Sequence, residues 1–121
     1  MEATTEQHSW LTGDELFFAK RGEHCWIIRV RDIDLIESKG NYSLIYFGAE
    51  QAEIYRSLNY LEQRLDPAMF LRANRHCIMN LRHVKDVVLW MDGGFQVRLT
   101  SGRVIALSRR QAKALKTQIS L

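Results

Sequence analysis

Apolar and polar positions alternate over short segments along most of this chain, a pattern typical of β-strands. Residues 95–100 alternate strictly, so we expect a strand with one buried face and one wet face. Ser101 and Gly102 then form a predicted two-residue hairpin turn before a return strand at 103–107. Further strands are predicted at residues 16–20, 25–30, 33–37, 42–47, 52–55, 71–73 and 84–90, with a turn at 38–41. The fold class predicted from this pattern is mainly β.

One internal segment has a helical period instead. Ser57 is a favourable N-cap, and Leu58, Leu61 and Leu65 follow at i, i+3 and i+7. Pro67 is expected to end this short helix, because proline cannot continue the hydrogen-bonding pattern.

A second helix is predicted at residues 109–119. Its apolar face consists of Ala112, Leu115 and Ile119. Lys113 and Lys116 fall away from that face. Ser108 is the expected N-cap, with Gln111 three residues later as in a capping box.

The start of this second helix is unusually basic. Arg109 and Arg110 lie in its first turn, where the helix dipole is already positive and a cation costs roughly 0.3–1 kcal/mol. Two such cations indicate an anionic partner, and a phosphate backbone also suits the free N–H groups of a helix start. The alternative is an ordinary exposed helix start that happens to be basic.

The charge distribution points the same way. Residues 1–56 hold 6 Lys and Arg against 10 Asp and Glu, a net charge of −4, whereas residues 57–121 hold 11 against 4, a net charge of +7. A basic half is typical of nucleic-acid binders. The 121 residues suit one domain, which we place at 15–121 after a flexible lead or linker remnant at 1–14.

No apolar run approaches the length of a membrane span, and the polar first residues do not resemble a secretory signal. We therefore expect a cytoplasmic protein without a membrane partner. Cys25 and Cys77, far apart in apolar settings, are expected to be reduced core thiols.

Catalytic and metal-binding patterns are poor. His76 and Cys77 are adjacent, so in a strand they point to opposite faces, and His83 is remote from both. The acidic cluster of Asp32, Asp34 and Glu37 comes without a glycine-rich phosphate loop and is interpreted as a solvated strand face. We expect no enzyme activity, no cofactor and no metal.

The order of short motifs along the chain resembles one family. The motifs are Asp32-Ile33, Ile36-Glu37-Ser38, Gly40-Asn41-Tyr42, Arg56-Ser57-Leu58, Leu61-Glu62 with Leu65, Phe70, Arg72, Arg75, Ile78, Asn80-Leu81, Ser108-Arg109-Arg110 and Leu115-Lys116. In order and spacing they resemble the LytTR-type DNA-binding domain, the output half of bacterial response regulators in two-component systems. The resemblance covers residues 15–121 and implies small antiparallel sheets side by side, with one short internal helix and a C-terminal helix.

The resemblance also implies a function and a site. It implies sequence-specific binding of double-stranded DNA for bacterial transcription regulation, with loops inserted in successive major grooves. The implied base contacts are Asn41, Tyr42, Arg75 and Arg109, and the implied phosphate contacts are Lys39, Ser43, Asn74, His76, Ser108, Arg110 and Lys113. Arginine suits base reading because it pairs bidentately with guanine. Two alternatives remain open: Asn41 as a turn former with positive φ, and Arg72 as a structural ion pair.

Two other functions and several partners also remain open. The chain is alternatively a protein-interaction module that pairs with and inhibits a related regulator, or an RNA-binding domain with Tyr42, Tyr46 and Tyr55 exposed on a sheet. The partners implied for a DNA binder are paired direct repeats and a second copy in a homodimer on DNA. A chain of this length is too short to hold the receiver domain of the family's common members, so it is either an effector domain of a longer parent chain or a free-standing relative.

Overall fold

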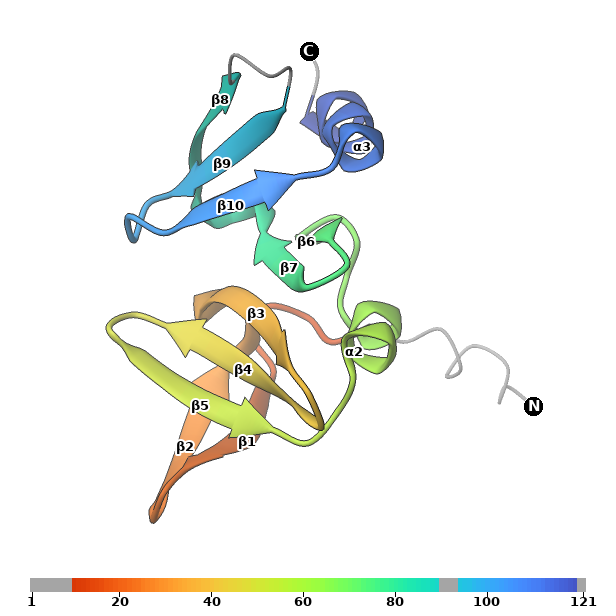
Figure 1. Cartoon of the computed structure of the whole chain (residues 1–121). Coiled ribbons are helices and arrows are strands. Elements are labelled where there is room, and N and C mark those ends of the chain that lie inside the picture. Colours follow the sequence, from red (N-terminus) through yellow and green to blue (C-terminus); the bar gives the residue numbers. More distant parts are fainter. Residues whose placement is uncertain (1–9, 90–93, 120–121) are drawn as a thin grey trace, which may run out of the picture.

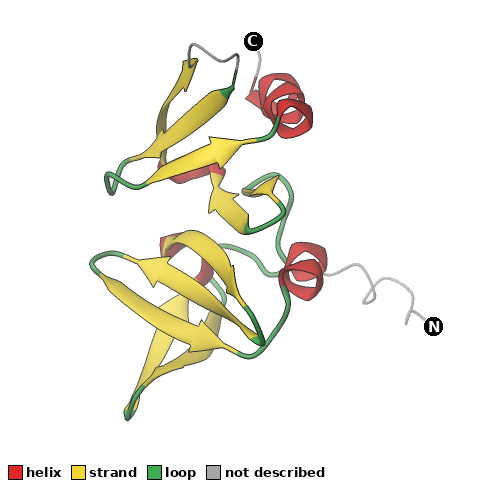
Figure 2. Cartoon of the chain, in the orientation of Figure 1, coloured by secondary structure: helices red, strands yellow, loops and turns green. Residues whose placement is uncertain are grey.

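The computed structural model describes residues 10–89 and 94–119, which fold into two antiparallel sheets and two α-helices (Figures 1 and 2). The strands are β1 (Leu16–Arg21), β2 (His24–Arg29), β3 (Ile33–Lys39), β4 (Tyr42–Phe47), β5 (Glu50–Ile54), β6 (Phe70–Asn74), β7 (Cys77–Asn80), β8 (Val84–Leu89), β9 (Phe95–Leu99) and β10 (Val104–Leu107). The helices are α2 (Leu58–Arg64) and α3 (Arg109–Ile119), with 3-10 turns at Val30–Asp32 and Leu81–His83. The predicted class, small antiparallel sheets with a short internal helix and a C-terminal helix, is confirmed.

The larger sheet has the strand order β2-β1-β5-β4-β3-β7-β6, and the smaller one has the order β10-β9-β8. Neighbours along the chain pair as hairpins wherever a short turn with glycine or polar residues joins them. β1 joins β5 at the single pair Lys20 and Glu53. In Figure 1 the small sheet and α3 lie above the larger sheet, next to its last two strands, β7 and β6.

Strand β3 contributes apolar residues to two hydrophobic cores. Ile33 and Ile36 pack into the first core, with α2 and the strands β1, β2, β4 and β5. Leu35 packs into the second core, with Met79 of β7 and residues of β9, β10 and α3. β3 is therefore covered on both faces, so strict alternation of apolar and polar residues is not required of it.

Asp34 corrects the expectation of a solvated acidic face. Its side chain is buried and links the two sheets: its carboxylate accepts a 2.7 Å hydrogen bond from the Ser101 hydroxyl and lies 3.3 Å from His83 Nδ1. Arg103 Nε lies 3.6 Å from the same carboxylate. A buried carboxylate needs such partners, and these come from residues 49 to 69 positions along the chain.

Asn80 is fully buried at the end of β7 and bonds three backbone groups in two segments of the chain. Its amide nitrogen donates to the carbonyls of Ile33, at 2.8 Å, and Arg31, at 3.2 Å. Its amide oxygen accepts from the Arg82 N–H at 2.9 Å, which caps the following 3-10 turn. The side chain thus fixes β7 against the start of β3.

The predicted positions of the two helices are confirmed, and the predicted apolar face of α3 is confirmed in part. Ser57 caps α2 as predicted, accepting from the Tyr60 N–H at 3.1 Å. The helix ends at Arg64, before Pro67. On the apolar face predicted for α3, Leu115 is buried whereas Ile119 is exposed.

Two further expectations differ from the structure, and two fall outside its described part. Residues 10–14 are not a loose lead: the Leu11 N–H donates to the Arg64 carbonyl at 2.8 Å, and Asp14 pairs with Arg31 at 2.7 Å. Residues 1–9 lie outside the described part of the chain, as does Trp90 of the predicted strand at 84–90. Cys77 is buried as expected, but Cys25 is exposed.

Candidate nucleic-acid interface

Three segments predicted to contact DNA lie next to one another on the side of the molecule that carries both helices (Figure 1). They are the β3–β4 turn, the β6–β7 turn and the start of α3. The Ser38 N–H donates to the His76 carbonyl at 2.9 Å, which joins the first segment to the second. The Ser108 N–H donates to the Ala73 carbonyl at 3.2 Å, which joins the second to the third.

The β6–β7 turn occupies the middle of this row. Arg75 and His76 form its exposed tip. Asn74 shapes it, because its side-chain oxygen accepts from the His76 N–H at 2.7 Å and its side-chain nitrogen donates to the Ala106 carbonyl at 2.6 Å. Both polar groups of Asn74 thus hold the turn in shape, and its contact with a phosphate stays a prediction.

Arg72 holds the same turn from behind. Its guanidinium donates to the carbonyls of Asn74 and Arg75 at 3.0 and 2.9 Å. It also reaches α2, donating to Asn59 Oδ1 at 3.0 Å and to Glu62 Oε1 at 2.9 Å. Of the two roles considered for Arg72, the structure shows the structural ion pair. Its planar guanidinium group donates to four acceptors at once.

The start of α3 is capped as the sequence predicted on one side only. The Ser108 hydroxyl accepts from the Gln111 N–H at 3.1 Å. The reciprocal bond of a capping box does not form, because the Ser108 N–H is bound to Ala73. Arg109, Arg110 and Lys113 are exposed, and none of them forms an ion pair with a carboxylate in the described residues.

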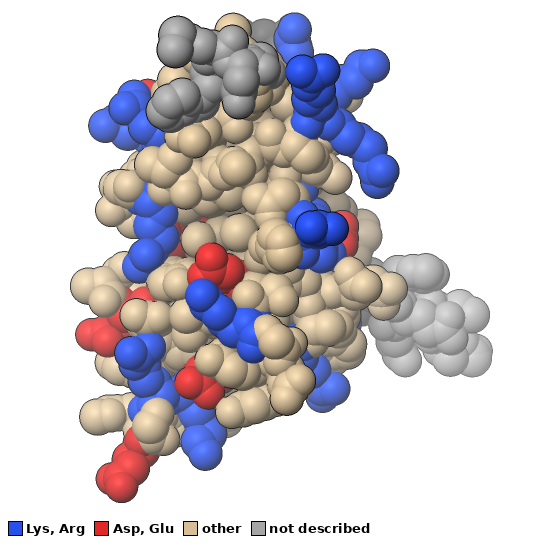
Figure 3. Space-filling model, viewed as in Figure 1, with Lys and Arg blue, Asp and Glu red and all other residues tan. Residues whose placement is uncertain are grey.

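A shallow groove lies between the β6–β7 turn and the start of α3. It is lined by Glu62, Arg72, Asn74, Arg75, Ser108, Arg110 and Gln111. Glu62 is its single acid, and Arg72 neutralises it. Figure 3 shows Lys and Arg side chains gathered over the neighbouring α3, with no acidic side chain visible over that helix.

The β3–β4 turn differs in detail from the prediction. Gly40 has a φ of 68°, whereas no described residue other than glycine has a positive φ, so the interpretation of Asn41 as a positive-φ turn former is wrong. Asn41 is exposed, and Tyr42 is half-buried with its ring 5.6 Å from that of Tyr55. Lys39 pairs with Glu37 at 3.3 Å.

Ser43 corrects the predicted set of phosphate contacts. It is buried, and its hydroxyl donates to the Arg56 carbonyl at 2.7 Å. The side chain therefore ties β4 to the segment before α2 and offers no group to a ligand.

Two groups beside the interface have raised pKa values. Burial, followed by the nearby Glu37 carboxylate, raises the pKa of the Cys77 thiol to about 11. Burial also raises the pKa of Tyr46, followed by its hydrogen bond to Glu37. A thiol with a raised pKa is a poor nucleophile, which fits a packing role for Cys77.

Exposed aromatic rings are sparse on this side. Tyr46 lies under the Arg103 guanidinium, 3.9 Å from its ring centroid, and bonds to Glu37 at 2.9 Å. Of the three tyrosines that an RNA-binding sheet would expose, Tyr55 alone is open to solvent.

In the described parts of the chain, no cluster of three metal-ligating side chains occurs and no helix is long and apolar enough to cross a membrane.

The family is decided by a comparison with known domains. The model of the LytTr DNA-binding domain matches residues 23–120. The chain belongs to this family.

Similar proteins are consistent with a LytTr domain. The chain is 30% identical over 99 residues to the "Sensory transduction protein LytR" of Staphylococcus haemolyticus, a match that covers 82% of this chain and 39% of that protein. It is also 30% identical over 95 residues to the "Transcriptional regulatory protein LytR" of Staphylococcus aureus strain MW2, covering 78% of this chain and 39% of that protein. The chain thus spans about two fifths of the length of these relatives.

A solved structure shares the fold of this LytTr domain. It is described as the LytTr DNA-binding domain of a putative methyl-accepting/DNA response regulator from Bacillus cereus. The TM-score is 0.81 at 17% sequence identity, and the match covers 90% of this chain and 100% of that one.

The supporting residues of the interface were not all predicted from the sequence. Asn59 and Glu62 reach Arg72 from α2, and Gln111 lines the groove. The bond between Asn59 and Arg72 spans 13 positions, so no local spacing indicates it.

Proposed function

We propose that this LytTr domain binds double-stranded DNA in a sequence-specific manner and regulates bacterial transcription. The observation that carries the proposal is the row formed by the β3–β4 turn, the β6–β7 turn and the start of α3. Their exposed cations, Arg75, Arg109 and Arg110, have no carboxylate partner within the described residues, so an external anion is their natural counterion.

The roles within the row follow from exposure and reach. Arg75 and Arg109 read base edges, since each projects from a segment end, and Asn41 and Tyr42 read bases from the β3–β4 turn. The residues assigned to phosphates are Lys39, His76, Ser108, Arg110 and Lys113. In this arrangement the three segments enter successive major grooves, and the middle turn is held in place by Arg72.

The proposal is tested by selecting bound duplexes from a random pool with the purified domain. We expect a pair of short direct repeats, spaced by one or two helical turns. If about 4–6 phosphates are neutralised, the slope of log affinity against log salt should be near −4 to −5. A flat salt response with no selected sequence would contradict DNA binding and favour the protein-interaction alternative; preference for competitor RNA would favour the RNA alternative.

Mutation should distinguish residues that contact bases from residues that contact phosphates. Arg75→Ala and Arg109→Ala are each expected to weaken cognate binding by roughly 1–3 kcal/mol, with little loss on random duplex. Lys113→Ala should weaken both duplexes equally and reduce the salt slope by about 1, because a lysine one turn into α3 reaches a phosphate. Binding is measured on both duplexes at two salt concentrations.

The control is Arg29→Ala, which removes an exposed arginine of β2, remote in the sheet from the row. It should alter neither duplex affinity by a measurable amount. If Arg75→Ala lost affinity equally for cognate and random DNA, Arg75 would contact a phosphate and not a base.

A further inference from the structure

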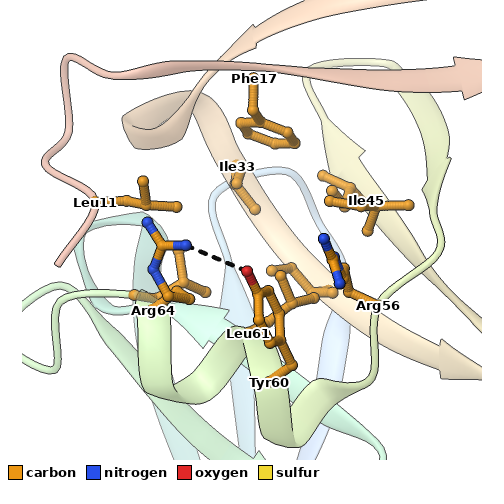
Figure 4. Close-up of a pocket in the computed structure, with 11 residues that line it drawn as sticks. Leu11, Phe17, Ile33, Ile45, Arg56, Tyr60, Leu61 and Arg64 are labelled. Carbon is orange, nitrogen blue, oxygen red and sulfur yellow. Dashed lines mark hydrogen bonds between the residues drawn. The ribbon is translucent and has the colours of Figure 1, made fainter. Parts of the chain in front are cut away.

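A cavity lies in the first core, beside α2 (Figure 4). Its volume is about 210 Å³. The walls are almost wholly aliphatic: Leu11, Ile33, Ile36, Ile45, Ile54, Leu61 and Leu65, with Phe17. An apolar cavity of about 150 Å³ is large enough to hold a benzene molecule, so this one has room for a somewhat larger apolar group.

The polar side chains of the cavity are two arginines and one tyrosine, and all three can donate hydrogen bonds. Arg56, Tyr60 and Arg64 complete its lining, and no acidic residue belongs to it. Figure 4 shows the two guanidinium groups on either side of the Tyr60 hydroxyl. Neither arginine forms an ion pair with a carboxylate of the described residues.

The internal contacts of these three side chains leave donors free. Arg64 Nη1 donates to the Tyr60 hydroxyl at 3.2 Å, so the phenolic proton remains available to an acceptor. The Arg56 guanidinium lies 4.6 Å from the centroid of the Tyr60 ring and makes a cation–π contact that positions it without neutralising it. Two cations and a hydroxyl donor thus meet beside an apolar chamber.

We propose that this cavity is a binding site for a small free carboxylic acid with an apolar body, such as a medium-chain fatty acid. The alkyl chain fills the aliphatic chamber, and the carboxylate is bound by Arg56, Arg64 and the Tyr60 hydroxyl. Charge complementarity selects this occupant: an apolar molecule without an anion leaves the arginines unpaired, and a cationic one is repelled by them.

The site lies where an occupant touches the scaffold of the interface. Tyr60, Leu61 and Arg64 face the cavity from α2, while Asn59 and Glu62 of the same helix bind Arg72. The occupant therefore contacts the helix that fixes the β6–β7 turn.

Calorimetric titration of the full chain at neutral pH with octanoate, octan-1-ol and octylammonium tests the proposal without DNA. Octanoate is expected to bind saturably at one site, octan-1-ol at least about 10-fold more weakly, since hydrogen bonds to charged groups are lost, and octylammonium not at all. Amide shifts in a titration followed by NMR should centre on Leu11, Phe17 and Tyr60.

Two variants address the two halves of the site. Arg64→Gln should weaken octanoate binding by about 10-fold or more while its backbone carbonyl still holds Leu11. Ile54→Trp fills the chamber from a partly exposed wall position and should abolish binding. Arg29→Gln, a loss of charge on exposed β2, should leave binding unchanged.

Three results would overturn the site. They are the absence of saturable octanoate binding, equal affinity for octan-1-ol, or amide shifts centred on a second apolar groove. That groove lies between α3 and the small sheet and is lined by Val87, Phe95, Leu107, Ala112, Leu115, Lys116 and Ile119. Unchanged affinity in both Arg64→Gln and Ile54→Trp, each shown to be folded by its NMR spectrum, would do the same.

Discussion

Replacement of Arg72 by alanine is expected to weaken binding to the selected operator on the order of 100-fold, since the reading contacts that depend on the turn are worth about 1–3 kcal/mol each. Arg72 is not among the proposed DNA contacts. Its side chain, 17% exposed, donates to the carbonyls of Asn74 and Arg75 and so fixes the turn that presents Arg75. Loss of these bonds frees the turn, and a mobile turn pays ordering entropy on binding. Operator affinity by fluorescence anisotropy measures the effect.

Arg72→Lys is the informative companion. Lysine keeps the charge but cannot reproduce the planar fork that binds four acceptors, so we expect it to restore little of the lost affinity. Arg98→Ala serves as the matched control, because Arg98 pairs with Asp86 on the exposed face of the small sheet. If Arg72→Ala, confirmed as folded, bound the operator as tightly as the parent protein, the β6–β7 turn would not depend on Arg72 for its presentation.

Replacement of Asn80 by leucine is expected to lower the free energy of unfolding by about 2–4 kcal/mol. The two side chains are similar in size, so the change leaves no large cavity. It does remove the hydrogen bonds to the Ile33 carbonyl and the Arg82 N–H within a fully buried site. Urea denaturation followed by circular dichroism gives the change in midpoint and slope.

The control for this variant is Gln63→Leu on the exposed side of α2, which should change stability by less than about 0.5 kcal/mol. A similar small change in Asn80→Leu would mean that water or a backbone shift satisfies the freed groups.

The two predictions concern the same strand pair. β6 and β7 lie between the two cores, so they support the turn that carries Arg75 and also join the larger sheet to the smaller one. Asp34 makes the second connection between the sheets, through Ser101 and His83. The interface therefore depends on contacts well behind its surface.

Elements with a local cause were predictable. The hairpin of β9 and β10 follows from strict alternation and a polar turn with glycine, and the starts of α2 and α3 follow from Ser57 and Ser108 as caps. The length of that turn was predicted wrongly: the Leu99 N–H donates to the Arg103 carbonyl, so the turn holds three residues and not two. In each case the interacting residues are within a few positions, so the pattern that encodes the contact is itself visible along the chain. The position of Arg75 in a turn, in contrast, was expected from the resemblance to the family and not from local spacing.

Residues whose role depends on distant partners were not predictable. Ser43 was expected to face a phosphate and is buried against Arg56, and Asp34 was expected in water and is buried against the small sheet. Cys25 lies in an apparently apolar run but is exposed, whereas Ile28 of the same strand is buried. Which face of β2 is covered depends on how distant elements pack against it, and no local window contains that information.

By itself the amino-acid sequence determined the mainly β class, both helix starts, the basic carboxy-terminal half and the order of motifs that places the chain among LytTr domains. Tertiary structure alone decided which polar side chains form hydrogen bonds inside the fold and which remain available to a ligand. Asn74 and Ser43 are engaged because the fold brings the backbone carbonyls of Ala106 and Arg56 to them. Arg72 is engaged because the fold brings the side chains of Asn59 and Glu62 to it. Arg75 and Arg109 remain because the fold brings them no carboxylate among the residues described, and that difference in partners is set by packing and not by residue type.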